Sequence, residues 1–173
     1  MPQDPPADSR VVLRPMTLAD LPQVEALDRE CFPTPWPKDA FRYELTRNPH
    51  AICWVAEVET QEGNKVIVGD MVVWLVVDEA HVSTLAVSPN YRKKHIAQRL
   101  MAKMLQLCKA KGAALAMLEV RKSNLAGQKL YTKFGFLVVG SRKGYYQDTK
   151  EDAILMTLPV LDDDELADLA DAG

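Results

Sequence analysis

The stretch SPNYRKKHIAQRL, Ser88 to Leu100, places three consecutive cations just before an expected helix. Apolar residues over 82–87 predict a strand that the Ser-Pro pair ends, and residues 96–111 carry apolar positions at helical spacing. Unpaired backbone N–H groups at a helix start attract anions, and the helix dipole adds to this. Because Lys93 and Lys94 bring further positive charge, the segment predicts a phosphate-binding loop. It lacks the glycines of a Walker loop or a dinucleotide fingerprint.

Glu119 is a carboxylate whose position favours proton transfer. Alternation along an expected strand over 113–121 places it on one face with Leu115 and Met117. Apolar neighbours make a carboxylate a stronger base. The alternative is a strand-end glutamate paired with Arg121 or Lys122.

Tyr131 is a candidate proton donor. It lies in a helix expected to begin after Ser123 or Asn124, beside the core positions Leu130 and Phe134. A phenol keeps its proton at neutral pH, so it can donate that proton to a leaving group. The alternative for Tyr131 is a boundary side chain that only packs its ring, and Asn124 can be a plain helix cap.

Composition and charge narrow the class of protein. The chain has 173 residues and a net charge of −3, which suits one globular domain, and its N-terminus has no apolar core typical of a signal peptide. The longest apolar stretch, 66–77, is too short to cross a bilayer. Three separated cysteines and three scattered histidines indicate reduced thiols and no metal site. We therefore expect a cytoplasmic protein that does not bind a membrane.

Charge is distributed unevenly. Residues 83–112 contain seven cations and no acid, whereas residues 151–173 contain eight acids and no cation. We interpret residues 161–173 as a frayed acidic C-terminal tail and residues 1–9, rich in Pro and Asp, as a flexible leader. The globular domain is expected over residues 10–160.

The pattern of the domain predicts an α/β or α+β fold with one mixed sheet. Thr17 and Asp20 resemble a capping box that opens the first helix, and Pro37 suits the first turn of the second. The expected helices cover 17–31, 37–46, 96–111 and 124–134. The expected strands cover 10–14, 51–59, 66–77, 82–87, 113–121, 136–141 and 153–158.

These motifs resemble the GNAT acetyltransferases. Residues 92–97, RKKHIA, are similar to the R/Q-x-x-G-x-G/A loop of that family, with His95 in place of the first glycine. The runs LEVRKSNLAGQKLYTKFGF (118–136), YYQDTKEDAILMTL (145–158) and CFPTPWPKDAF (31–41) resemble the RimI-type branch, the ribosomal-protein alanine N-acetyltransferases. The resemblance covers residues 10–160.

The resemblance implies the acyl-CoA N-acyltransferase fold of this family, a mixed and mostly antiparallel sheet of about seven strands flanked by about four helices. It implies transfer of acetyl from acetyl-CoA, without a metal, to the N-terminal α-amine of a ribosomal protein, an alanine in this branch. Glu119 would be the general base, through a water molecule, and Tyr131 the general acid. The backbone amide of Val87 could stabilise the oxyanion.

The same resemblance implies the binding residues. Cofactor contacts are expected along the strand that pairs with the pantetheine arm, in the phosphate loop and at the later helix cap: Leu85, Ala86, Val87, Arg92, Lys93, Lys94, His95, Ile96, Ala97, Gln98 and Asn124. The acceptor groove is expected to be lined by Phe32, Trp36, Tyr145 and Tyr146. Their alternative role is packing.

Other functions stay open at this point. A GNAT domain could acetylate other protein N-termini, a lysine side chain or a small amine. Replacement of glycine by His95 would suit a domain that binds acyl-CoA or a protein partner without catalysis, although Glu119 and Tyr131 argue for an enzyme. Arg92, Lys93 and Lys94 could contact nucleic acid, but the acidic net charge and the lack of interleaved aromatic residues argue against this. The expected partner is a protein N-terminus, and the expected state is a monomer or weak dimer.

Overall fold

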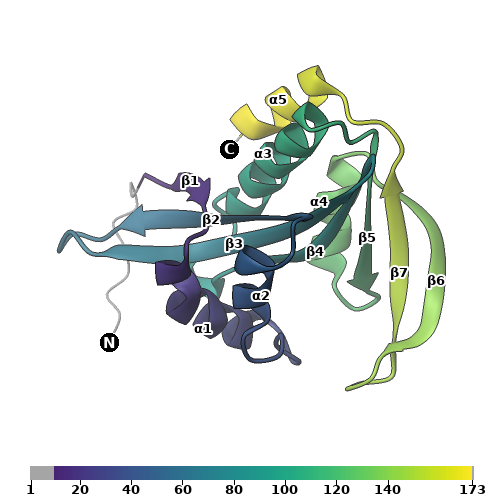
Figure 1. Cartoon of the computed structure of the whole chain (residues 1–173). Coiled ribbons are helices and arrows are strands. Elements are labelled where there is room, and N and C mark those ends of the chain that lie inside the picture. The colour runs from purple at the N-terminus through teal and green to yellow at the C-terminus, as the bar shows by residue number, and fades with distance from the viewer. Residues whose placement is uncertain (1–9, 173) are drawn as a thin grey trace.

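The computed structural model describes residues 10–172, so the leader predicted over residues 1–9 lies outside the described residues. The described chain folds into seven strands and five α-helices (Figure 1). The strands are β1 (Val12–Pro15), β2 (Ala51–Glu59), β3 (Lys65–Val76), β4 (Glu79–Val87), β5 (Leu115–Arg121), β6 (Leu137–Tyr146) and β7 (Glu151–Leu158). The helices are α1 (Leu21–Cys31), α2 (Ala40–Thr46), α3 (Ile96–Ala110), α4 (Leu125–Lys133) and α5 (Asp163–Asp171).

The strands form one sheet in the order β1-β2-β3-β4-β5-β7-β6. Neighbouring strands are antiparallel except β4 and β5, which run parallel. The predicted mixed, mostly antiparallel sheet of seven strands is therefore confirmed. One helix more than expected is present, at the C-terminal end of the described chain.

The pairing between β4 and β5 is short. Residues 79–82 of β4 pair with residues 115–118 of β5. Beyond them, β4 stays with β3 as far as Val87, while β5 stays with β7 as far as Arg121. The two strands thus separate, and the sheet opens between them (Figure 1). A register shift in the β3–β4 pair at Val72/Val73 lies close to this opening, where a bulge adds local twist.

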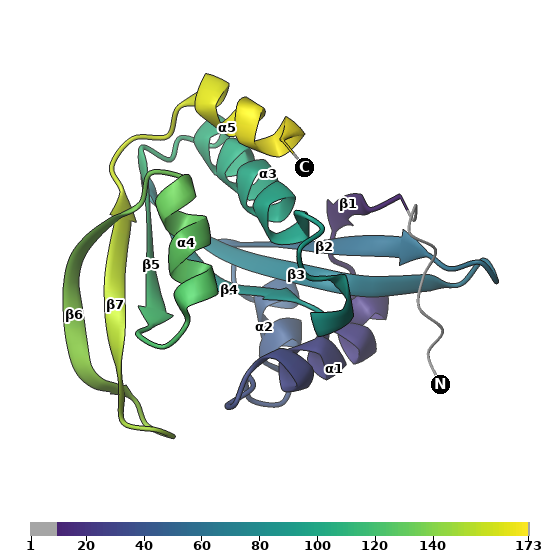
Figure 2. The ribbon, with the colours of Figure 1, turned by 180° about the vertical axis from the view of Figure 1, so that it is seen from behind.

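Helices cover both faces of the sheet, and each face has its own core. On one face α1 and α2 bury Val24, Leu27 and Phe41 against strand residues that include Val55 and Val72. On the other face lie α3, α4 and α5, and the buried apolar side chains there include Leu100, Met104, Leu166 and Phe134, the residue directly after α4. Figures 1 and 2 show these two sets of helices from opposite sides.

The first helix begins as the sequence predicts, and the second begins later. The backbone N–H of Thr17 donates to Asp20 Oδ2 at 2.7 Å, and a 3₁₀ turn at Leu18–Asp20 leads into α1. Helix α2 begins at Ala40 instead of Pro37, because Asp39 has a left-handed backbone with φ of 64°. A residue in that conformation separates the Pro37 turn from the regular helix.

Residues 161–171 correct the interpretation of a frayed acidic tail. Asp162 caps α5 by accepting hydrogen bonds from the backbone N–H groups of Asp164 and Glu165, both at 3.0 Å. Leu161 and Leu166 are buried in the core beside α3. The acids in the first turn face a favourable helix dipole. Helix α5 is therefore a docked part of the fold. None of the helices within residues 10–172 is long and apolar enough to span a membrane.

Candidate active site

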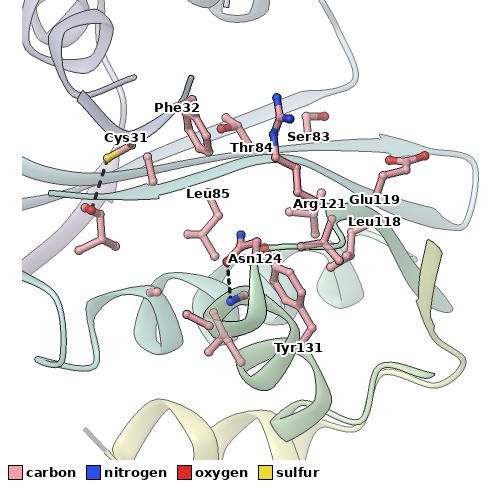
Figure 3. A pocket seen from close by; sticks show the side chains of 18 of the residues that line it. Cys31, Phe32, Ser83, Thr84, Leu85, Leu118, Glu119, Arg121, Asn124 and Tyr131 are labelled. Atoms are coloured by element: carbon pink, nitrogen blue, oxygen red, sulfur yellow. Dashed lines mark hydrogen bonds between the residues drawn. The ribbon is translucent and has the colours of Figure 1, made fainter. Parts of the chain in front are cut away.

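A cavity of about 1010 Å³ lies in the opening between β4 and β5 (Figure 3). Residues 82–87 of β4 and 118–121 of β5 line it, together with the start of α3, one side of α4, the segment after α1 and the end of β6. All site residues predicted from the sequence line this cavity, with the exception of Lys94. The Nζ of Lys94 lies instead 5.3 Å from the ring centroid of Tyr91.

The backbone of Val87 faces the cavity. Ser88 donates its N–H to the Val68 carbonyl at 2.9 Å, and in an antiparallel ladder the adjacent residue then points its polar groups the other way. The Val87 carbonyl accordingly accepts hydrogen bonds from Cys31 Sγ and Arg92 Nε, each at 3.4 Å. The N–H of Val87 is thus directed at the opening, as an oxyanion donor requires.

The loop before α3 contains no glycine, but two of its residues adopt a left-handed backbone conformation that is typical of glycine. Lys93 has φ of 61° and His95 has φ of 57°, both in the left-handed region. His95 is exposed and directly precedes Ile96, the first residue of α3. Histidine tolerates this conformation better than most residues. The backbone shape that the family motif assigns to glycine is therefore present, and Ile96, Ala97 and Gln98, whose N–H groups have no partner within the helix, line the cavity.

Gln98 contributes to the fold through its side chain. Its Nε2 donates to the Leu169 carbonyl of α5 at 2.6 Å, and its Oε1 accepts from Lys133 Nζ of α4 at 2.6 Å. The side chain is buried. Gln98 ties α3, α4 and α5 together, so only its backbone is available to a ligand in the cavity.

Glu119 projects from β5 and lines the cavity, as predicted. Its hydrogen-bond partner is His81 of β4, with 2.7 Å between His81 Nε2 and Glu119 Oε2. Glu119 therefore does not pair with Arg121 or Lys122, the alternative that the sequence left open. Arg121 instead binds Asp148 and Glu151.

Tyr131 projects from α4 into the same cavity. Burial raises the pKa of its phenol to about 12, and the side chain is only 9% exposed. The ring centroids of Tyr131 and Phe136 lie 5.9 Å apart, so the tyrosine ring also packs in the core. A phenol with this pKa is fully protonated at neutral pH and can act as a proton donor.

Asn124 is the N-cap of α4. Its Oδ1 accepts a hydrogen bond from the N–H of Gly127 at 2.9 Å (Figure 3). A Cβ on Gly127 would lie 2.7 Å from Asn124 Nδ2, so a larger residue at position 127 would displace the Asn124 side chain. The cap is confirmed, and Asn124 also lines the cavity.

The four aromatic residues expected in the acceptor groove also reach the cavity. Phe32 and Trp36 come from the segment after α1, and Tyr145 and Tyr146 from the end of β6. The backbone N–H of Trp36 donates to Asp28 Oδ2 at 2.6 Å.

Tyr146 and its hairpin are held by Arg121. The Arg121 guanidinium carbon lies 3.9 Å from the Tyr146 ring centroid. Both segments that carry these four aromatic residues therefore have specific anchors in the described chain.

His81 was not predicted from the sequence, and Arg121 was not assigned to the site. His81 could not be found, because its contact with Glu119 depends on the parallel pairing of strands whose contacting residues are 38 positions apart. Arg121 had a signal, since it follows Glu119 by two residues and shares its strand face. Among residues 10–172, no three His, Cys, Asp or Glu side chains are grouped as a metal site would require.

Comparison with known proteins agrees with this geometry. Residues 21–136 match the model of the acetyltransferase (GNAT) family. A Bacillus subtilis protein with the provisional name ribosomal protein bS18-alanine N-acetyltransferase is 37% identical over 152 residues, which cover 88% of this chain and 97% of that protein. The Escherichia coli (strain K12) ribosomal protein bS18-alanine N-acetyltransferase is 29% identical, covering 82% and 92% respectively.

A solved structure shows the same architecture. The crystal structure of the ribosomal-protein-S18-alanine N-acetyltransferase from Escherichia coli superposes with a TM-score of 0.76 at 27% identity, covering 87% of this chain and 94% of that one. The family match spans strands β2 to β5, the loop before α3 and most of the cavity lining. This chain therefore belongs to the GNAT acetyltransferase family.

Proposed function

We propose that this protein transfers the acetyl group of acetyl-CoA to the N-terminal α-amine of a ribosomal protein, with alanine as the acceptor residue. The names of its relatives point to bS18 as that protein. The observation that carries the proposal is the meeting of three groups in one cavity: the Glu119 carboxylate, the Tyr131 phenol and the backbone of Val87.

The cavity suits an extended acyl-CoA. The backbone of β4 beyond residue 82 has no β5 partner, so the amide-rich pantetheine arm can pair with it as an added strand would. The amides at the start of α3, with Lys93 and Arg92 nearby, suit the pyrophosphate. Leu85, Ala86 and Val87 then direct the thioester toward Glu119 and Tyr131.

Glu119 acts as the general base. A free α-amine has a pKa of about 7.7–8.0, so much of it is protonated and non-nucleophilic near neutral pH. Glu119 removes a proton from the amine, directly or through a water molecule. The neutral amine then attacks the thioester carbonyl carbon.

Val87 and Tyr131 serve the later steps. The N–H of Val87 donates to the oxygen that becomes negative in the tetrahedral intermediate. When the C–S bond breaks, Tyr131 donates its proton to the coenzyme A sulfur. Both groups reach the cavity from separate elements, β4 and α4, which fixes their relative positions.

The acceptor chain enters between the segment after α1 and the end of β6. Phe32, Trp36, Tyr145 and Tyr146 offer flat apolar surfaces to the first residues of the acceptor. A small N-terminal alanine suits this arrangement, because the aromatic residues line the same cavity as Glu119, Tyr131 and Val87.

The test is release of coenzyme A thiol from acetyl-CoA with a short peptide that begins with a free alanine. Glu119→Gln and Tyr131→Phe should each lower kcat by about a hundredfold or more, the usual contribution of a positioned acid or base. Glu62→Gln and Tyr43→Phe are matched controls, because both residues are exposed and lie outside the cavity. These two variants should retain full activity.

A second peptide separates the acceptor classes. It has a blocked N-terminus and an internal lysine, and it should not be acetylated. Acetylation of this peptide alone would assign the enzyme to lysine side chains. Absence of both thiol release and acetyl-CoA binding would instead favour a binding module without catalysis.

A further inference from the structure

His81 and Glu119 form a side-chain pair across the short parallel seam between β4 and β5. His81 lies opposite Met117 in the register, and Glu119 follows two residues later on the same face. The distance between His81 Nε2 and Glu119 Oε2 is 2.7 Å. The side chains are 27% and 23% exposed, so the contact is mostly shielded from water.

His81 approaches Glu119 from outside the cavity. Glu119 belongs to the cavity lining and His81 does not. On the β3 side the imidazole meets the uncharged ring of Trp74, with 5.6 Å between ring centroids. The ionisable group that faces it from β5 is Glu119. Tyr146, which interacts electrostatically with Glu119, has a pKa raised to about 12 by burial and is neutral at assay pH.

We propose that His81 is the positioning residue of the general base: its Nε2–H donates to Glu119 Oε2 and leaves Oε1 free to take the proton of the acceptor amine. This inference rests on the function proposed above. A glutamate side chain has several rotamers, and one fixed oxygen restricts it to those that face the substrate. His81 transfers no proton itself, so no other bond is made or broken at this residue.

The kinetic test compares His81→Ala with His81→Gln. Alanine removes the donor, and kcat should fall at least about tenfold, which is the worth of one hydrogen bond to a charged group. Glutamine places an amide N–H near the position of Nε2 and should restore most of kcat. The KM for acetyl-CoA should stay unchanged in both variants, because His81 does not line the cavity.

A double variant separates positioning from general stability. If His81 acts through Glu119, adding His81→Ala to Glu119→Gln should cause no further loss of kcat. Equal losses in both backgrounds, or failure of glutamine to restore the rate, would overturn the proposal. His50→Gln is the matched control: His50 Nδ1 lies 3.2 Å from the Leu75 carbonyl, outside the cavity, and its replacement should leave kcat unchanged.

Nuclear magnetic resonance tests the pair without any catalysis. The ring ¹⁵N shifts of His81 should change in Glu119→Gln, while those of His50 should not. Unchanged His81 shifts would overturn the pairing. If the His81 shifts respond but the wild type does not acetylate the alanine peptide, the pairing is supported and the acceptor proposed above is wrong.

Discussion

Thr34 Oγ1 donates a hydrogen bond of 2.7 Å to Asp148 Oδ2, and this contact joins two segments 114 residues apart. Thr34 belongs to the segment after α1, and Asp148 to the turn between β6 and β7. Both line the cavity. Arg121 binds the same carboxylate through two nitrogens, at 2.8 and 3.1 Å, and holds the pKa of Asp148 well below its usual range. An ionised Asp148 thus connects the two segments that carry the aromatic residues proposed to bind the acceptor.

Removal of this contact should affect the acceptor more than the acetyl donor. Thr34→Val keeps the side-chain shape and removes the donor, so the KM for the alanine peptide should rise about fivefold. The KM for acetyl-CoA should not change. Thr34→Ser retains the hydroxyl and serves as the control. Steady-state kinetics with each substrate varied in turn would measure this, and a rise confined to the acetyl-CoA KM would contradict the role.

The left-handed backbone of His95 predicts the effect of two substitutions. Glycine has no penalty at φ of 57°, whereas a β-branched residue meets about 1–2 kcal/mol of steric cost. His95→Gly should therefore bind acetyl-CoA at least as well as the wild type, and His95→Val should bind it more weakly with a lower Tm. Isothermal titration and thermal unfolding give the two quantities. Weaker binding by His95→Gly would show that the imidazole itself contacts the ligand.

Asp70 should make the stability of this protein depend on pH. It is fully buried on β3, neither carboxyl oxygen has a hydrogen-bond partner, and burial together with the nearby Asp28 raises its pKa well above the usual value. The folded state therefore holds a proton that the unfolded chain releases above a pKa of about 3.9, and stability is lost as pH rises. Asp70→Asn removes this titration, so the free energy of unfolding of the variant should increase relative to that of the wild type as pH rises.

Urea unfolding at about pH 5 and about pH 8 measures this effect, since one unit of pKa displacement corresponds to about 1.4 kcal/mol. Asp78→Asn is the control, because Asp78 is exposed in the turn after β3. Parallel pH profiles for the wild type and Asp70→Asn would mean that Asp70 titrates normally.

The contribution of Tyr131 to kcat should be the same at every pH in the ordinary assay range. Its pKa of about 12 keeps the phenol protonated well above neutral pH. Tyr131→Phe should therefore lower kcat by a similar factor at every pH between about 6.5 and about 9.5, without moving either limb of the profile. Full pH–rate profiles of both proteins would show this. An alkaline limb that disappears in Tyr131→Phe would assign that limb to the tyrosine.

Much of the site was predictable because it follows local rules. The loop at residues 92–97 was visible from charge at a helix start, and alternation placed Glu119 on the face that reaches the cavity. Helical spacing placed Tyr131 one turn from Phe134. Each of these predictions uses residues within a few positions of one another, where geometry is set by the backbone itself.

The remaining features depend on distant contacts or on context. The approach of His81 to Glu119 requires the register of two strands joined through α3. Asp70 lies within the apolar stretch 66–77, and no sequence pattern indicates that its carboxyl group is buried without a hydrogen-bond partner. The acidic composition of α5 obscured Leu161 and Leu166, whose burial against α3 decides that the helix docks.

The short seam between β4 and β5 gives the bound donor a structural role. The sheet is joined there by residues 79–82 and 115–118, and the two helical layers hold the rest together. If the pantetheine arm pairs with the open edge of β4, the sheet of the unliganded protein has an unpaired edge that bound acetyl-CoA covers. In each catalytic cycle this pairing would be lost when coenzyme A dissociates, and it would form again when the next acetyl-CoA binds. The seven-stranded sheet of the described residues would then gain an eighth strand, the pantetheine arm, for part of each catalytic cycle.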